Sequence, residues 1–280
     1  MGSRFASILV SAFVLVLLAS CGTTLDEPES ILDMQVMYGS PDTEHVGVGL
    51  MVFDVGGVPA WRCTGTLLAP NVMLTAGHCT FGATGGRVWF EGDVDAGWPD
   101  NGYPFPGEAS IEFVEIHTHD AFVPEAFFLH DLGLVILEAP APGVTEEDFG
   151  VLPPVGYLDG LATRRGQSDQ LFTPVGYGLQ SVKPVLSDDL VRHSGTVRLI
   201  GVRGTFGLPE GVAVAFTNSP GAAQPGGTCF GDSGGPVFAE GTNTIAAVTS
   251  FGLNVNCAGT GGGYRIDQVD DLAWIGPFLE

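Results

Sequence analysis

The stretch TCFGDSGGPVF, residues 228–238, places Ser233 after an aspartate and among closely spaced glycines, with a proline three positions later. Residues without side chains add little to a packed core, but they let a loop bring backbone N–H groups against a ligand. The stretch is therefore typical of a loop that presents a reactive hydroxyl. Two enzyme architectures place a serine in such a loop, and the rest of the chain distinguishes them.

The first architecture is excluded by the order of residues along the chain. The sequence GDSGG fits the pattern Gly-x-Ser-x-Gly, in which a strand leads to the serine, a helix follows it, and the histidine comes last. All six histidines precede Ser233. In addition, Gly234-Gly235-Pro236 is a poor start for a helix.

The remaining order is histidine, aspartate, serine. The segment LTAGHC ends an apolar run with His78, and HDLGLVIL places Asp131 at the start of a run that is apolar enough to be buried. A histidine can take the proton of the Ser233 hydroxyl, and a buried aspartate can hold the imidazole in the required tautomer. Asp120 is a weaker candidate for the acid, because no buried run follows it.

These three segments, in this order, resemble the signatures of the chymotrypsin-like (trypsin-family) serine peptidases, over roughly residues 36–280. The resemblance implies an all-β fold of two six-stranded antiparallel β-barrels with the active site between them. The N-terminal barrel would cover about residues 40–150 and the C-terminal barrel about 151–280. A helix is expected at the end, where Ile266, Val269 and Ala273 fall at helical spacing.

The resemblance also implies the chemistry. His78, Asp131 and Ser233 would form a catalytic triad that cuts protein or peptide substrates through an acyl-enzyme intermediate. The N–H groups of Gly231 and Ser233 would form the oxyanion hole. We expect a monomer that needs no cofactor and no metal. The alternatives are a catalytically silent binding or adhesion protein of the same fold, and an esterase.

The substrate pocket implied by the resemblance contains three glycines. Gly227 would form its floor, and Gly252 and Gly262 its rims, so we expect an open, uncharged pocket that favours large apolar side chains. Ser250 to Gly252 would pair with the substrate backbone as an added strand.

Five cysteines are present, at positions 21, 63, 79, 229 and 257. The sequence alone leaves three pairings open for the last four. The resemblance implies one disulfide between Cys63 and Cys79 and another between Cys229 and Cys257.

The N-terminus predicts export. After Arg4 comes an apolar run of 16 residues, short for a membrane span and long enough for the core of a signal peptide. The run ends in Leu-Ala-Ser-Cys, which resembles the lipobox of bacterial lipoproteins. We therefore expect a signal peptide at residues 1–20, lipidation of Cys21, and a tether or propeptide at 21–35. The lipid would anchor the protein to a membrane of the bacterial cell envelope, and the alternative is that the protein is shed to the exterior.

Activation is left open by the sequence. In the family, the aspartate that matches Asp232 pairs with a new N-terminal amine after cleavage. The nearest counterpart of the cleavage site is VMYG, which begins at Val36. Cleavage there would separate the chain from a lipid on Cys21. Either the anchored form is an inactive precursor, or the site is ordered without a new terminus.

Composition and the remaining polar residues exclude other functions. A net charge of -22, with Lys183 as the only lysine, excludes a nucleic-acid partner. His117 and His119 suggest a metal, but solvated histidines are the default interpretation, and His130 is interpreted as a polar neighbour of the triad acid. The acidic residues Glu91, Asp93 and Asp95 suggest a calcium site, but a solvated acidic loop is the default interpretation.

Overall fold

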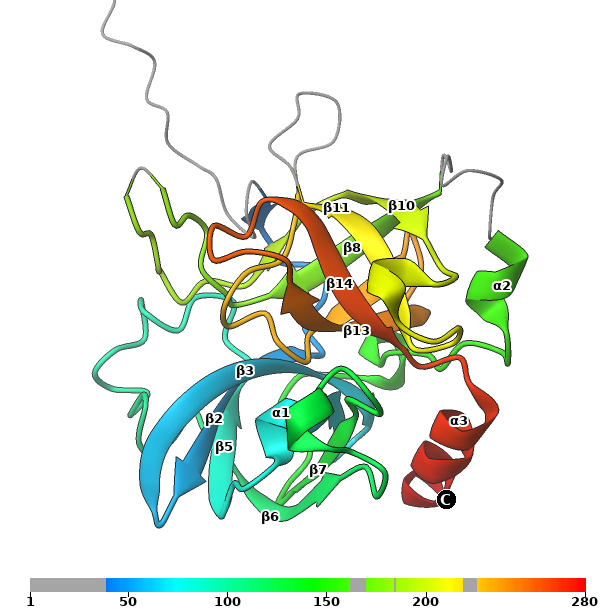
Figure 1. The fold of residues 1–280 in the computed structure, drawn as a ribbon. Helices are drawn as coiled ribbons and strands as arrows, with labels where there is room; N and C mark the ends of the chain where they lie inside the picture. Colours follow the sequence, from blue (N-terminus) through cyan, green and yellow to red (C-terminus); the bar gives the residue numbers. More distant parts are fainter. Residues whose placement is uncertain (1–38, 162–169, 184, 219–225) are drawn as a thin grey trace, which may run out of the picture. The chain divides into compact units, whose positions relative to one another are not determined.

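The computed structural model describes residues 39–161, 170–183, 185–218 and 226–280. The predicted signal peptide, Cys21, the tether and Val36 lie outside these residues. The described part contains two closed six-stranded antiparallel barrels and a C-terminal helix (Figure 1). The fold class implied by the resemblance is confirmed. No helix in the described part of the chain is long and apolar enough to cross a membrane.

The first barrel is closed in the order β2-β3-β4-β7-β6-β5. The prolyl-asparagine turn at residues 70–71 joins two apolar runs into an antiparallel pair, β3 and β4, as their sequence predicts. The strands are β2 (Val48–Val55), β3 (Val58–Ala69), β4 (Val72–Thr75), β5 (Gly85–Trp89), β6 (Ile111–Thr118) and β7 (Gly133–Leu137).

The second barrel is closed by the pairing of its end strands, β8 and β12, in the order β8-β10-β11-β14-β13-β12. Two short strands extend its sheet: β1 (Ser40–Pro41) pairs with β9 (His193–Ser194), which pairs with β8. The first strand of the chain therefore joins the sheet of the second barrel, although we expected residues from about 40 in the first. The barrel strands are β8 (Leu171–Gly176), β10 (Val197–Gly201), β11 (Ala213–Asn218), β12 (Pro236–Ala239), β13 (Ile245–Gly252) and β14 (Gly259–Arg265).

One hydrophobic cluster joins the two barrels. It includes Leu74 and Leu134 from the first barrel, Phe238 and Val248 from the second, and Ile275 from the C-terminal helix. Because side chains of both barrels pack together in this cluster, the loops of the two barrels that meet beside it are held against one another. Those loops carry the predicted triad.

The helices are short. They are α1 (Gly77–Thr80), α2 (Tyr157–Leu161) and α3 (Val269–Ile275), and the 3-10 turns are η1 (Pro124–Ala126), η2 (Glu146–Asp148), η4 (Thr205–Gly207) and η5 (Gly276–Leu279). The predicted C-terminal helix is confirmed as α3, but its predicted apolar face is wrong. Val269 and Ala273 are exposed, whereas Asp271 and Ile275 are buried. Pro277 lies within η5, which continues the chain in a tighter turn beyond α3.

Candidate active site

The histidine of the predicted triad lies in α1, the short helix that follows β4. The helix begins at Gly77. A side chain is disfavoured at this position, because a Cβ would lie 2.9 Å from Phe122 and 3.0 Å from the backbone of Leu132. The backbone N–H of His78 donates to Oδ1 of Asp131 at 2.8 Å. Its Nδ1 lies 2.9 Å from Oδ2 and 3.1 Å from Oδ1 of the same carboxylate. These contacts place the ring proton on Nδ1 and leave Nε2 as a proton acceptor.

Asp131 precedes β7 and is completely buried. Besides the two donors of His78, it receives a third hydrogen bond at Oδ2, from the hydroxyl of Ser250 at 2.5 Å. A buried carboxylate needs such donors to offset the loss of water. The resemblance assigns Ser250 to substrate pairing, and the sequence gives no signal of its side-chain contact with Asp131.

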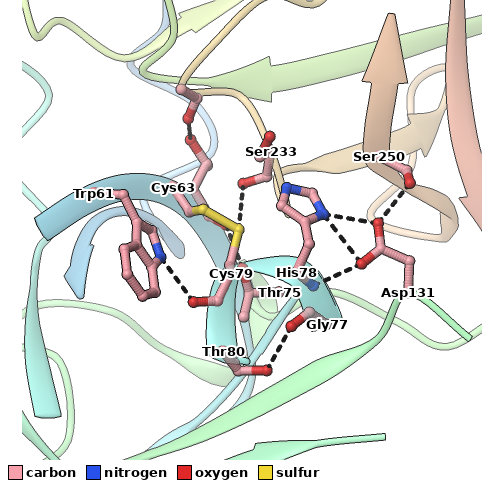
Figure 2. The surroundings of a disulfide bond; sticks show 12 residues. Trp61, Cys63, Thr75, Gly77, His78, Cys79, Thr80, Asp131, Ser233 and Ser250 are labelled. Carbon is pink, nitrogen blue, oxygen red and sulfur yellow. Dashed lines mark hydrogen bonds and ion pairs between the residues drawn. A yellow bond between two sulfur atoms is a disulfide. The ribbon is translucent and has the colours of Figure 1, made fainter. Parts of the chain in front are cut away.

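Ser233 lies beside His78, on the same cavity. Figure 2 shows the imidazole of His78 between Ser233 and the Asp131 carboxylate, which itself contacts Ser250. The carbonyl oxygen of Ser233 accepts the N–H of Thr64 at 2.8 Å. Because Thr64 belongs to β3, the loop of residues 228–235 that carries Ser233, called the serine loop below, is fixed to a strand of the first barrel. The structure thus brings together the three residues of the predicted triad.

Two glycines of the serine loop are required by the backbone. Gly231 has a φ of 102° and Gly234 a φ of 79°, in the region that side chains disfavour. A Cβ on Gly234 would also lie 2.0 Å from the hydroxyl of Thr75. The carbonyl of Gly231 accepts the hydroxyl of Thr64 at 2.9 Å. The glycine-rich stretch is therefore explained by tight packing against the first barrel.

The N–H groups of Gly231 and Ser233 make no hydrogen bond to any described residue. An oxyanion hole requires donors of this kind, with no partner in the folded chain, beside the serine. Between them, Asp232 is buried, and its carboxylate accepts the N–H of Gly178 and the N–H of Cys229, both at 2.8 Å. Burial raises the pKa of Asp232 to about 6, against the opposing effects of these two N–H groups and of the positive charge of Arg62.

Both disulfides implied by the resemblance are present, Cys63–Cys79 and Cys229–Cys257. The first joins β3 to α1 and so fixes the helix that carries His78 (Figure 2). The second joins the serine loop to the segment that follows β13.

A cavity of ≈ 490 Å³ adjoins His78 and Ser233. Five large apolar side chains line it, those of Phe127, Phe230, Phe251, Leu253 and Val255. All of them except Phe251 are exposed to solvent. The lining comprises His78, Phe127, Thr228, Cys229, Phe230, Ser233, Thr249, Ser250, Phe251, Gly252, Leu253, Asn254, Val255 and Cys257.

The three-glycine description of this pocket is corrected by the structure. Only Gly252 lines the cavity. A Cβ on Gly227 would lie 2.2 Å from Oδ1 of Asn218, and one on Gly262 would lie 2.5 Å from the ring of Phe251. Side chains therefore occupy the space that we expected to be open beside two of the glycines.

The other polar candidates lie apart from the cavity. His119 is buried, so the expectation that it is solvated is wrong. His117 is partly exposed and lies 2.8 Å from Glu115. The acidic loop that contains Glu91 and Asp93 is held by hydrogen bonds within the first half of the chain. The carboxylate of Glu91 accepts the side-chain N–H of Asn101, and that of Asp93 accepts the backbone N–H of Ala96.

Comparisons with known proteins identify the family of the chain. The trypsin family model matches residues 50–273, and the chain belongs to that family. A collagenase of Hypoderma lineatum is 25% identical over 195 residues, which cover 70% of this chain and 67% of that protein. A trypsin of Saccharopolyspora erythraea is 26% identical over 193 residues, 68% of this chain and 75% of its own.

A solved structure is also similar. HL collagenase superposes with a TM-score of 0.63 at 21% identity and covers 86% of this chain and 96% of its own. At that identity the likeness concerns the fold alone.

Proposed function

We propose that this protein is a serine endopeptidase in which His78, Asp131 and Ser233 form the catalytic triad. The observation that carries the proposal is the bond from Nδ1 of His78 to the buried Asp131 carboxylate, next to Ser233 on one cavity. A serine hydroxyl alone is a poor nucleophile, and this arrangement supplies the base and the group that orients it.

The reaction follows from the contacts. Nε2 of His78 takes the proton of the Ser233 hydroxyl while its oxygen attacks the substrate carbonyl. The imidazolium is stabilised by Asp131 and returns the proton to the leaving amine, so that an ester of Ser233 remains. Water then attacks this ester by the same route and regenerates the hydroxyl.

The oxyanion of each tetrahedral intermediate would accept hydrogen bonds from Gly231 and Ser233, whose N–H groups make none in the described structure. Removing one such donor in other serine peptidases costs about 2.7–4 kcal/mol of transition-state stabilisation. Both donors are backbone groups of a loop held by Thr64, so they need little reorganisation when charge develops.

The cavity favours an apolar residue on the amino side of the cleaved bond. Phe127, Phe230, Phe251, Leu253 and Val255 contribute its apolar surface, and among the described residues the lining includes no aspartate, glutamate, lysine or arginine. The end of β13, Ser250–Gly252, offers an edge against which an extended peptide can pair. Such an edge serves a peptide better than a simple ester.

We also propose that the site is ordered without a new N-terminus. Both oxygens of Asp232 already accept backbone N–H groups at 2.8 Å in the uncleaved chain. Asp232 therefore has a backbone donor at each oxygen before any amine forms at Val36. This leaves membrane anchoring through Cys21 compatible with activity.

The exported, lipid-anchored form is proposed on the sequence alone. Metabolic labelling with an alkyne fatty acid, compared between the parent and Cys21→Ser, tests it. Labelling that is equal in the two chains would contradict lipidation of Cys21.

Hydrolysis of fluorogenic peptides tests the function. We expect turnover with phenylalanine before the cleaved bond to exceed that with arginine, and Ser233→Ala and His78→Ala to abolish both. Ser181→Ala serves as a control, because the hydroxyl of Ser181 bonds, among the described residues, only to the backbone carbonyls of Lys183 and Val185. Turnover of simple esters without any turnover of peptides would favour the esterase, and full activity of Ser233→Ala would refute the triad.

A further inference from the structure

Three potential metal ligands converge beneath α3, away from the cavity. His119 follows β6, His130 precedes the triad aspartate, and Asp271 lies in α3. Nε2 of His119 and Nδ1 of His130 each lie 3.7 Å from Oδ1 of Asp271. One ligand atom from each of the three residues lies within 4.8 Å of the others.

These distances are close to those of a metal centre. Zinc binds imidazole nitrogens and carboxylate oxygens at about 2.0–2.2 Å in a tetrahedral arrangement, which separates ligand atoms by roughly 3.3–3.6 Å. The two distances to Asp271 exceed that range by little. The separation between the two histidines needs a larger movement, because their rings are stacked with centroids 4.8 Å apart.

The surroundings leave a buried carboxylate without a permanent cation. Asp271 is completely buried and accepts the hydroxyl of Tyr264 at 3.0 and 3.1 Å. No arginine or lysine in the described ranges forms an ion pair with it. Buried charges are usually paired or coordinate a metal, so the arrangement calls for a positive partner.

The cluster is open to solvent on one side. The side chain of His130 is 33% exposed, and Oδ2 of the exposed Asp270 lies 4.0 Å from its Nδ1. An ion can therefore enter from the side of His130, where Asp270 offers a fourth ligand. The remaining position of a tetrahedral site would otherwise be filled by water.

Contacts at both histidines oppose metal binding. The hydroxyl of Tyr264 lies 3.5 Å from Nδ1 of His130, the atom that would coordinate the ion, and would have to turn away from it. The N–H of Ala121 donates to Nδ1 of His119 at 3.2 Å, which leaves the ring proton on Nε2. Coordination at Nε2 would move the proton to Nδ1 and break this bond. Ala121 and its neighbour Asp120 are exposed, so the turn has room to rotate and let the N–H reach water.

We propose that His119, His130 and Asp271 bind one divalent transition-metal ion of the zinc type, which joins α3 to the loop that carries Asp131. The site does not depend on peptidase activity. The ion would stabilise the folded chain, because the unfolded chain does not hold the three ligands together.

The test uses the full-length chain with His78→Ala as the parent, so that the triad imidazole cannot bind the ion. After treatment with a chelator, zinc chloride is titrated by calorimetry, and thermal unfolding is followed with and without zinc. We expect one equivalent to bind and the melting temperature to rise. His130→Gln and Asp271→Asn should each weaken binding at least about tenfold.

His117→Ala is the matched control, because His117 is also partly exposed and lies two residues from His119. It should bind zinc like the parent. Cobalt chloride gives an independent readout: intense visible absorption bands are expected in the parent and should be lost in His130→Gln.

Equal zinc affinity in the parent and in His130→Gln would overturn the proposal, as would absence of binding by the parent. His130 is partly exposed, so this variant decides the question even if Asp271→Asn fails to fold.

Discussion

At the scale of single residues, the candidate active site depends on a few buried polar groups whose hydrogen bonds are satisfied by other residues. Asp131 illustrates this, because donors from α1 and from β13 meet on one carboxylate. The triad itself could be predicted, since each member lies in a short motif. The contact of Ser250 could not, because it joins residues that are 119 positions apart and serine carries no local signal of its partner.

Ser250→Ala tests how much this third hydrogen bond contributes to catalysis. Hydrogen bonds to charged groups are worth about 1.5–3 kcal/mol, so we expect kcat to fall roughly ten- to hundredfold. KM should change little if the hydroxyl only positions Asp131. Steady-state kinetics on one fluorogenic peptide measure both constants. A rise in KM at constant kcat would instead assign Ser250 to substrate binding.

Asp42 should make the free energy of unfolding depend on pH in the acidic range. Burial alone would raise its pKa, but the hydrogen bonds and charge of His45 outweigh this and lower it to about 2. Between about pH 4 and pH 2 the unfolded chain then binds more protons at this position than the folded chain. The contribution of Asp42 to stability is present above this window and is lost as the pH falls through it.

Urea unfolding of the parent and of Asp42→Asn at several acidic pH values measures this contribution. The free energy of unfolding should fall less steeply with decreasing pH in the variant. Glu44→Gln, which changes an exposed carboxylate nearby, should keep the steep slope. Equal slopes in the parent and Asp42→Asn would contradict the assignment.

At the scale of elements, patterns of apolar residues predicted most strands but not every buried face. In the first half of the chain, the runs HVGVGLMVF, CTGTLLAPNVMLTAGHC and DLGLVILEAP correspond to β2, β3, β4 and β7. In the second half, LFTPVGYGL, HSGTVRLIGV, GVAVAFTNS, GPVFAE and TIAAVTSFG correspond to β8, β10, β11, β12 and β13. The glycine-rich β14 was not predicted as a strand, because four of the seven residues of GTGGGYR are glycines, which are depleted in strands, and only Thr260 and Tyr264 are of types that favour them. In α3 the apolar spacing was misleading, since the buried positions include Asp271, which bonds to Tyr264.

The face of α3 that the structure shows to be buried leads to a prediction for two substitutions, one on the buried face and one on the exposed face. Ile275 is completely buried in the cluster shared by the barrels, so Ile275→Ala should cost about 2–5 kcal/mol of unfolding free energy. Val269 is 66% exposed on the same helix, and Val269→Ala should change stability by less than about 0.5 kcal/mol. Urea unfolding measures both, and similar costs would show that α3 is not docked through Ile275.

At the scale of the whole molecule, two barrels that share one cluster position three chemical groups from distant parts of the chain. The resemblance to a known family supplied this arrangement, since composition alone favours only an all-β protein. The size and lining of the substrate cavity could not be predicted in the same way. They depend on Asn218 and Phe251, whose positions beside Gly227 and Gly262 follow from long-range packing.

The proposed function requires that Ser233 is competent in the uncleaved chain. The most direct test is reaction of the full-length protein with a fluorophosphonate probe, with Ser233→Ala as control and the N-terminus of the labelled chain established by intact mass. We predict labelling of chains that still contain Cys21 and no labelling of the variant. Labelling only of chains that begin at Val36 would contradict ordering without a new terminus, and absence of labelling in both forms would contradict the peptidase itself.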